Sequence, residues 1–346
     1  MTEKWIVTGG CGFIGTNVCE SLVADGITPI VVDNLARPRV HQNLTMLRDE
    51  LGVQCHVVDI RDREGLRACL ASHADARVVL HLAGQVSFVA SLRNPRYDFE
   101  TNAMGTFNVL EAVRDLIPAA AVIYSSTNKV YGDLAQLRTD ETETRYVLPD
   151  FPAGIPNDLP LHLHGGYGCS KGSADQLVTD WAEFHGVHGV SLRQSSIYGG
   201  RQFATEDQGW AAFFAERFVS DEPYSISGNG KQVRDLLHVD DLYRAYRCAA
   251  DSIEAIVGRA FNIGGGVSNS ASLLELFDQL QRRTGFRPSY TAGPPRPFDQ
   301  KVFIADTSEF TARTGWEPRV GLDQGLDELV DWARVLAGSS AAGGQP

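Results

Sequence analysis

Short apolar runs alternate with amphipathic segments through the first half of the chain. The apolar runs are typical of strands buried on both faces of a parallel sheet, and they lie at 5–8, 30–33, 54–58, 78–81 and 122–125. Helical patterns separate them near 14–24, 62–72 and 100–116, and a sixth strand is predicted over 187–193. This alternation predicts an α/β fold built on a doubly wound parallel sheet.

The regular alternation of strands and helices ends after Tyr198-Gly199-Gly200. Gly-rich turns and short helices dominate the rest of the chain, including an amphipathic helix near 272–283. We interpret this part as a smaller C-terminal lobe over the carboxyl edge of the sheet. The predicted division is a large domain over 1–193 and 234–265, a smaller lobe over 194–233 and 266–335, and a disordered tail over 336–346. The long segment 133–166 carries several prolines and is expected to be a lid or binding loop.

Composition narrows the class of partner. A chain of 346 residues that is 43% hydrophobic can bury a sizeable core, and its formal net charge of -12 argues against nucleic acid or anionic membranes. The apolar runs are too short to span a bilayer. The first strand follows Met1-Thr2-Glu3-Lys4 directly, so we expect no signal peptide and a cytoplasmic location. The six cysteines form no CxxC pair and no His/Cys spacing indicates zinc, so we predict free thiols and no metal.

A glycine-rich turn follows the first predicted strand and opens a helix. Its spacing is GxxGxxG, in Thr8-Gly9-Gly10-Cys11-Gly12-Phe13-Ile14-Gly15. The glycines permit a tight turn and a close approach of backbone to a pyrophosphate, and the helix N-terminus supplies N–H groups. In this context a dinucleotide is favoured over a plain strand-to-helix turn. The sheet is therefore predicted to be Rossmann-type, and the predicted dinucleotide contacts in the turn are Gly9, Gly12, Phe13, Ile14 and Gly15.

Residues at later strand ends extend this predicted site. Asp33 is placed to bind the adenosine ribose, and its charge favours NAD over NADP. Arg37 and Arg39 leave the other cofactor open, because they could hold a 2′-phosphate or simply be solvated. Asp59 contacts the adenine edge together with Ile60, or else caps a helix. Further contacts are expected from Leu82, Ala83, Gly84, Ser125, Ser195 and Ser196.

Tyr167 and Lys171 are four residues apart, which places them on one face of a helix. A free tyrosine, with a pKa near 10, is a poor base at neutral pH. We expect the Lys171 ammonium and a positively charged nicotinamide to favour the phenolate, which would then take a proton from a carbinol. Thr127 is expected to hydrogen-bond to the same oxygen. Such a pair is common on helix surfaces, so only its combination with the Gly-rich turn and Asp33 predicts catalysis.

With these motifs the chain resembles the extended short-chain dehydrogenase/reductase family, which contains nucleotide-sugar epimerases and dehydratases. The resemblance covers nearly the whole chain, and its further motifs are Asp33-Asn34-Leu35, 81–84, 101–106, 193–199, 234–241 and 262–265. It implies tightly bound NAD and a catalytic triad of Thr127, Tyr167 and Lys171. It also implies that Asn34 and Asn102 support cofactor binding, and that the enzyme is a homodimer or tetramer assembled through helices near 92–116 and 167–186.

The residues after Thr127 indicate which of the family's reactions this chain would catalyse. Dehydratases of the family carry adjacent Asp and Glu here, and decarboxylases keep a Glu, whereas this chain has Asn128 and Lys129. An amide and an ammonium cannot do carboxylate acid–base work, so elimination is disfavoured unless an acid of the 133–166 loop substitutes. An epimerase needs no such acids, because it withdraws a hydride and returns it to the other face.

Longer motifs point to one branch of the family. Segments 125–134, 141–146, 198–210 and 226–235 are similar to enzymes that invert C2 of a CDP-linked 6-deoxy- or 3,6-dideoxyhexose. Gly165, Gly166 and Gln194 depart from that pattern. We therefore predict an NAD-dependent nucleotide-sugar epimerase acting at C2. A 4-epimerase, a 4,6-dehydratase and a non-catalytic NAD-binding regulator remain the alternatives.

Several residues are candidates for holding the substrate. Arg234 and Arg296 are candidates for its diphosphate, because a guanidinium fork suits phosphate oxygens. For Arg296 a salt bridge with Asp235 or Asp299 is an equally good interpretation. His164 follows His162 just before the catalytic tyrosine and either contacts substrate or is solvated. The remaining predicted substrate contacts are Gln85, Lys129, Arg201 and Gln208.

Overall fold

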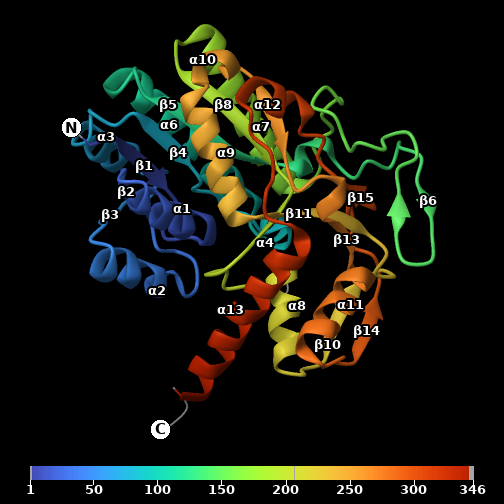
Figure 1. The fold of residues 1–346 in the computed structure, drawn as a ribbon. Helices are drawn as coiled ribbons and strands as arrows, with labels where there is room; N and C mark the ends of the chain where they lie inside the picture. Colours follow the sequence, from blue (N-terminus) through green and yellow to red (C-terminus); the bar gives the residue numbers. More distant parts are fainter. Residues whose placement is uncertain (1, 206, 343–346) are drawn as a thin grey trace.

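The computed structural model describes residues 2–205 and 207–342, and a sheet of parallel strands forms its centre (Figure 1). Its seven strands lie in the order β12-β8-β5-β4-β1-β2-β3. Their bounds are β1 Lys4–Thr8, β2 Thr28–Asp33, β3 Gln54–Val57, β4 Val78–His81, β5 Ala121–Thr127, β8 His188–Gln194 and β12 Ala260–Ile263. The predicted doubly wound, Rossmann-type fold is confirmed.

The strand order reverses at β1. The chain moves outward through β2 and β3 on one side, and then returns to β4 and continues outward on the other. Open α/β sheets bind ligands beyond the carboxyl ends of the strands at such a switch point. The glycine-rich turn follows β1 directly, so the fold places it at that point.

Two helical layers cover the sheet because its strands are apolar on both faces. On β1, Trp5 and Val7 enter one core and Ile6 enters the other. The first core is covered by α1 (Phe13–Ala24) and α9 (Val239–Asp251). The second is covered by three helices, α3 (Arg63–Ala71), α6 (Gly105–Leu116) and α7 (Gly165–Phe184).

Shorter helical segments connect these layers. They are α2 Val40–Thr45, η1 Met46–Glu50, α4 Phe88–Arg93, α5 Pro95–Phe99, η2 Glu100–Met104, η3 Asn128–Tyr131, α10 Ile253–Ile256, η4 Val267–Asn269 and α12 Ser308–Thr314. The segments η1 and η2 are π-helical turns, which often mark functional sites. None of the described helices combines the length and apolar character needed to cross a lipid bilayer.

A smaller lobe lies beyond the carboxyl edge of the large sheet (Figure 1). Its core is aromatic, with Phe214, Phe218 and Phe277 packed together. Its strands are β9 Ser196–Tyr198, β10 Tyr224–Ser227, β11 Val233–His238, β13 Ser270–Ser272, β14 Tyr290–Gly293 and β15 Val302–Phe303. Its helices are α8 Trp210–Val219, α11 Leu273–Thr284 and α13 Leu322–Ala342.

The structure divides the chain somewhat differently from the sequence prediction. The expected boundary at Arg234 falls inside β11, which pairs with β9, β13 and β15 of the smaller lobe. Phe310 of α12 packs in the core of the large domain instead. Helix α13 continues to Ala342 through most of the tail that we expected to be disordered. Its apolar side chains before that tail, such as Leu329 and Ala333, pack with α8 in the core of the smaller lobe. The remainder of that tail, 343–346, lies outside the described residues.

The 133–166 segment folds against both lobes. It contains a two-stranded hairpin of β6 (Asp140–Glu141) and β7 (Tyr146–Val147), which projects from the molecule (Figure 1). Leu134, Leu148 and Ile155 are buried beside Phe303 of the smaller lobe. The segment is therefore anchored by apolar packing at several points.

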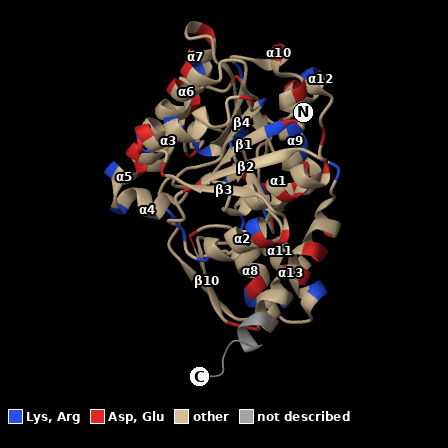
Figure 2. Ribbon diagram, turned by 90° about the vertical axis from the view of Figure 1, so that its left-hand side faces the viewer, with Lys and Arg blue, Asp and Glu red and all other residues tan. Residues whose placement is uncertain are grey.

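Positively and negatively charged residues are interspersed along the outer helices (Figure 2). Between α3 and α6, Arg63 pairs with Glu111 at 2.7 Å and Arg67 pairs with Asp115 at 2.9 Å. Such exposed pairs contribute little to stability individually. In this view Lys and Arg residues are mixed with Asp and Glu residues and do not form a basic stripe.

Candidate active site

A cavity of about 570 Å³ lies along the carboxyl ends of the central strands, with walls from both lobes. Most of the residues predicted to bind cofactor or substrate line it. They are Gly9, Gly12, Phe13, Ile14, Gly15, Asp33, Asn34, Ile60, Leu82, Ala83, Gly84, Gln85, Ser125, Thr127, Lys129, Tyr167, Lys171, Ser195, Ser196 and Gln208. Six other candidates lie outside its described lining: Asp59, Asn102, His164, Arg201, Arg234 and Arg296.

The glycine-rich turn leaves its backbone open to the cavity. Gly9 has φ +70, and a Cβ there would lie 2.8 Å from the Ala83 nitrogen. A Cβ on Gly84 would lie 2.9 Å from Asn102 Oδ1. Helix α1 starts at Phe13 with glycine as its N-cap, so no side chain covers its first-turn N–H groups. This cradle fits a pyrophosphate, which those groups would bind.

Asp33 is tied to the same turn. Its carboxylate accepts hydrogen bonds from the Cys11 nitrogen at 3.0 Å and the Leu35 nitrogen at 2.8 Å. Burial raises the pKa of the Asp33 carboxyl, although these bonds and nearby Arg37 oppose the change. Arg37 also lines the cavity and donates to Gln208 across it. The acid at the ribose position fits NAD, since it would repel a 2′-phosphate.

Asp59 lies between two residues that line the cavity, and its expected contact with the adenine edge stays a prediction. Its carboxylate pairs with Arg61 at 2.7 Å and accepts from Asn34 Nδ2 at 2.9 Å. The hydrogen bond to Arg61 is the main reason why the pKa of Asp59 falls to about 2. The cap of α3 is Asp62, which accepts from the Gly65 nitrogen. The helix-cap interpretation of Asp59 was therefore wrong, while Ile60 beside it does line the cavity.

The three predicted catalytic residues meet in the middle of the cavity. Tyr167 and Lys171 stand one turn apart on α7, and Thr127 ends β5. Lys171 Nζ donates to the Ser125 carbonyl at 2.5 Å and lies 4.2 Å from the centre of the Tyr124 ring. Only 4% of Lys171 is exposed, so its ammonium is fixed beside the strand end.

Burial has the largest effect on the pKa values of Tyr167 and Lys171 in the protein alone. Burial raises the pKa of Tyr167 to about 12, with a hydrogen bond from Thr127 opposing the change. Burial also lowers the pKa of Lys171 to about 7, against the charges of Asp175 and Asp98. Burial is the largest cause of the Tyr167 change. The phenolate that we expect Lys171 and a nicotinamide charge to favour belongs to the NAD-bound enzyme, and it stays a prediction.

Sequence reasoning missed the two buried acids that support Lys171. Asp175 pairs with Arg193 at 2.8 Å, and both side chains are almost fully buried. Asp98 accepts from Ser170 Oγ at 2.5 Å and Gln85 Nε2 at 2.6 Å. Asp175 follows Lys171 by one helical turn, so the same spacing argument would have found it. Asp98 has no comparable local signal.

Asn102 holds the framework behind the cavity. It accepts from the Gln85 nitrogen at 2.8 Å and donates to Ser170 Oγ at 3.0 Å. It lies in the π-helical turn η2 and is buried. The Gln85 side chain is occupied by Asp98 and the Ser87 carbonyl. Asn102 and Gln85 thus position the part of the cavity wall that lies beside α7.

The cavity holds few acids. Among the described residues that line it, only Asp33 and Asp207 carry carboxylates. The position after Thr127 is Asn128, whose amide donates to Gln300 Oε1 at 3.2 Å, and the next is Lys129. The described lining includes no acid from the 133–166 segment, so the substitution that would permit elimination is not seen there.

Charged side chains meet beside Lys129, at the end of the cavity where we expect the substrate. Asp299 binds Lys129 Nζ at 3.0 Å and an Arg234 guanidinium nitrogen at 2.8 Å. Arg234 and Lys129 are the main reasons why the pKa of Asp299 is lowered to about 2, against the effect of burial. Arg296 lies 3.7 Å from Asp207 and donates to Ser227 Oγ, and its charge also lowers the pKa of Asp299.

The other candidates are held as follows. Arg201 pairs with Glu20 at 3.0 Å on the surface, away from the cavity. The ring nitrogens of His164 and His162 bond to each other at 3.0 Å. Ser195 donates to Asp235, and Ser196 accepts from Trp210 Nε1 at 3.1 Å. Sequence reasoning gave no reason to separate Arg201 from the cavity candidates.

Comparison with known proteins identifies the family. The model of the NAD dependent epimerase/dehydratase family matches residues 5–264. The chain belongs to this family. A curated relative, CDP-paratose 2-epimerase from Salmonella typhi, is 44% identical over 338 residues, covering 96% of this chain and 100% of its own.

Solved epimerases of the family share the fold. UDP-glucose 4-epimerase from Thermotoga maritima, crystallised with UDP-glucose, has a TM-score of 0.82 and 31% identity over 96% of this chain and 99% of its own. UDP-glucose 4-epimerase from Thermus thermophilus, in complex with NAD, has a TM-score of 0.81 and 28% identity with the same coverage. The protein is an NAD-dependent epimerase, and the cradle around Gly9 and Asp33 fits that cofactor.

Proposed function

We propose that this enzyme inverts C2 of a CDP-linked 6-deoxy- or 3,6-dideoxyhexose, with CDP-paratose as the first substrate to test. The observation that carries the proposal is the Tyr167, Lys171 and Thr127 group beside Asn128 and Lys129, in a cavity whose described lining has no acid of the long loop. The proton-transfer groups are present, and the paired acids of an elimination are missing from the expected place. The similarity to CDP-paratose 2-epimerase supports the choice of carbon and nucleotide.

Two residues of the group, Tyr167 and Thr127, would act on one substrate oxygen, and Lys171 would support them. NAD, when bound, supplies a hydride acceptor, the returning hydride and a positive charge that favours the phenolate. Tyr167 takes the proton of the C2 hydroxyl as the carbon is oxidised, and gives it back after the keto-sugar has turned its other face. Thr127 holds the same oxygen by a hydrogen bond. Lys171, fixed by the Ser125 carbonyl, holds the nicotinamide ribose hydroxyls and stabilises the phenolate.

The substrate end supplies positive groups in an acidic protein. We infer that Arg234 and Lys129 exchange Asp299 for the substrate diphosphate, which offers more acceptor oxygens. Gln208, beside Asp207, faces the same space as Arg37. Arg234 also lies outside the described lining, but it shares Asp299 with Lys129, which lines the cavity. Arg296 lies 3.7 Å from Asp207 of the lining and stays a candidate. Arg201 and His164 are weaker candidates, because Arg201 pairs with Glu20 and His164 with His162.

We also infer a homodimer formed by the helices near 92–116 and 167–186. Its support is a set of exposed apolar side chains on these helices, where Leu92 is 57%, Met104 46% and Phe184 69% exposed. Light scattering of the wild type and of Met104→Glu tests this inference. The cytoplasmic location expected from the sequence remains a prediction.

The decisive experiment uses CDP-paratose carrying deuterium at C2. We expect the 2-epimer to form without added NAD and to keep its deuterium, because one bound cofactor removes and returns the same hydride. Loss of the label to solvent would contradict this mechanism. UDP-glucose serves as the competing substrate, since a product inverted at C4 would support a 4-epimerase.

Two other outcomes would support different functions. A 4-keto-6-deoxy product would identify a dehydratase. Bound NAD with no turnover of any sugar in the panel would favour a regulator that has kept the fold.

A further inference from the structure

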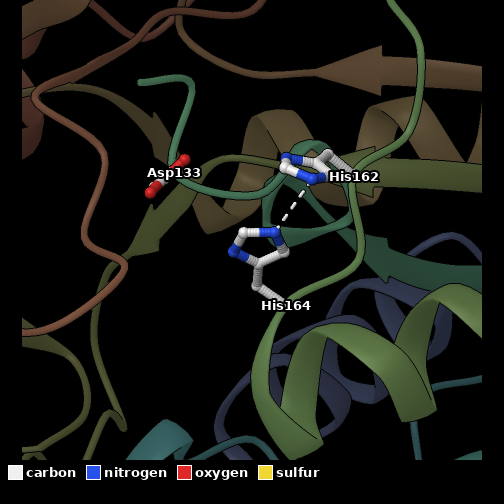
Figure 3. Close-up of side chains that lie close together, drawn as sticks. All are labelled: Asp133, His162 and His164. Atoms are coloured by element: carbon white, nitrogen blue, oxygen red, sulfur yellow. Dashed lines mark hydrogen bonds between the residues drawn. The ribbon is translucent and has the colours of Figure 1, made fainter. Parts of the chain in front are cut away.

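Two histidines and one acid meet at the base of the 133–166 segment. Figure 3 shows Asp133 beside the paired rings of His162 and His164. One potential ligand atom from each residue lies within 4.8 Å of the other two. The three residues come from the two ends of the same long loop, so the fold and not the local sequence assembles them.

The backbone fixes this arrangement. His164 has an extended backbone, with φ -127 and ψ 145. The rings of His162 and His164 face each other, while Leu163 between them packs against Gly172. The His162 nitrogen donates to the Val130 carbonyl at 2.9 Å. This bond holds His162 over Gly132, where an added Cβ would lie 3.4 Å from His162 Nδ1.

The hydrogen bonds available within the group do not use all of its nitrogens. His162 Nε2 and His164 Nε2 share one hydrogen bond of 3.0 Å, in which only one of them can donate. Nδ1 of His164 is buried and has no hydrogen-bond partner among the described residues. The Phe298 ring packs edge-on against this imidazole, with centroids 5.2 Å apart. A buried nitrogen without a partner is costly, and a metal ion is one ligand that would satisfy it.

We propose that Asp133, His162 and His164 bind a divalent transition-metal ion, with Zn²⁺ as the preferred candidate. Two imidazole nitrogens and one carboxylate oxygen are a typical zinc donor set, and they leave a fourth position for water or a ligand oxygen. The site lies at the positive end of α7, and the Asp133 carboxylate offsets that unfavourable field. The sequence predicted no metal because His-x-His alone is a weak signal and the acid is distant in the chain.

Such an ion would cross-link the two ends of the 133–166 segment. Closing a long loop reduces the conformational freedom of the unfolded chain, so the ion should stabilise the segment that packs on both lobes. The site is separate from the proposed proton transfer, since none of its three residues is in the described lining of the main cavity. The inference therefore does not depend on which sugar is the substrate.

A second cluster of the same residue types supplies a matched control. His238, Asp240 and Glu328 also lie within ligand distance of one another. There, however, His238 Nε2 faces Glu328 at 3.2 Å and His238 Nδ1 accepts from the Asp240 nitrogen at 3.4 Å. Both ring nitrogens already have partners, so this cluster is expected to bind no metal.

The test is titration of the chelator-treated full-length enzyme with Zn²⁺ alone, by calorimetry and by competition with a chromophoric chelator. We expect one ion per chain. His162→Gln and Asp133→Asn should each weaken binding at least about tenfold, whereas Glu328→Gln should leave it unchanged. Co²⁺ in place of Zn²⁺ should give the strong visible absorption of a four-coordinate site, a readout that does not depend on activity.

The outcomes separate the alternatives clearly. Absence of stoichiometric binding to the wild type would overturn the proposal, as would binding that survives both His162→Gln and Asp133→Asn. Loss of binding in Glu328→Gln would move the site to the other cluster and also overturn it. Slower proteolysis of the 133–166 segment with Zn²⁺ in the wild type, but not in His162→Gln, would support the proposed metal cross-link.

Discussion

The two ends of the cavity are built from different kinds of interaction. At the cofactor end, backbone atoms of the glycine-rich turn approach Ala83 closely and bind the Asp33 carboxylate. At the substrate end, charged side chains from distant parts of the sequence meet, as in the pair of Lys129 with Asp299. One end depends on the absence of side chains, and the other depends on which side chains are present.

This difference separates what the fold requires from what selects the substrate. A backbone cradle binds the pyrophosphate that every member of the family shares, and it tolerates almost no added atom. A charged side-chain group can change without altering the sheet, so it can adapt to different sugars and nucleotides. Substitutions at the two ends should therefore impair different properties of the enzyme.

The largest expected effect is at Tyr167, where the two ends meet. Tyr167→Phe removes the group that transfers the proton, so turnover should fall about 1,000-fold. The fold and the bound NAD should be retained, because the phenol oxygen is not part of the framework that holds α7. The measurement is turnover of the C2-deuterated sugar, together with the NAD released on denaturation.

Tyr146→Phe is the matched control for this change. Its hydroxyl accepts a hydrogen bond from Asn229 in the exposed hairpin region. Its turnover should stay close to that of the wild type. If Tyr167→Phe kept most of its activity, another residue would have to be the proton acceptor.

The next effect tests the backbone end. Gly9→Ala forces a residue with φ +70 to carry a Cβ at 2.8 Å from the Ala83 nitrogen. We expect a loss of about 3 kcal/mol in the free energy of unfolding, from strain and displacement, together with loss of bound NAD. Gly26→Ala has a similar φ of +74 but open space around it, so it should cost only about 1 kcal/mol. Urea unfolding of both variants measures the difference, and equal losses would contradict the argument from close approach.

The same contrast explains what the sequence could predict. The glycine-rich turn, Asp33 and the Tyr167/Lys171 pair are local patterns, and the structure places all of them on one cavity. The partners of Lys129 and Asn128, which are Asp299 and Gln300, lie 170 and 172 residues away in the chain. No periodicity links residues at such separations.

The sequence also could not show how deeply each side chain is buried. The pairing of Tyr167 with Lys171 was read from spacing, but the pKa of Tyr167 depends on how completely the phenol is desolvated. Arg201 shows the same limit, because we predicted that it contacts the substrate, while the fold pairs it with Glu20. Local chemistry indicates candidates, and only the packing decides which of them face the cavity.

A smaller effect is expected at Asp235, where the two lobes join. Its carboxylate is fully buried and accepts from the Ser195 hydroxyl and from the Gly266 and Ala305 nitrogens. Burial raises the pKa of Asp235 to about 6. The folded protein therefore binds an extra proton between about pH 4 and pH 6, and this group's contribution to the free energy of unfolding falls as the pH rises through that window.

Asp235→Asn removes this titration. The stability of the variant relative to the wild type should therefore rise by about 2 kcal/mol between pH 4 and pH 7, whatever its absolute loss from the altered hydrogen bonds. Urea unfolding of both proteins across this range provides the measurement. A constant difference would show that the carboxyl titrates normally despite its burial.

The smallest effect tests the side-chain end. Arg234→Gln keeps hydrogen-bonding capacity but removes the charge that we propose meets the diphosphate, so KM for the sugar nucleotide should rise about tenfold. Turnover at saturation and bound NAD should change little, because Arg234 lies outside the described lining that contains Tyr167 and the glycine-rich turn. Arg138→Gln, at an exposed pair with Asp140, changes the net charge equally and should leave KM unaltered. If Arg234→Gln lowered NAD content or stability as Gly9→Ala does, Arg234 would belong to the framework, and the substrate end would be as rigidly specified as the cofactor end.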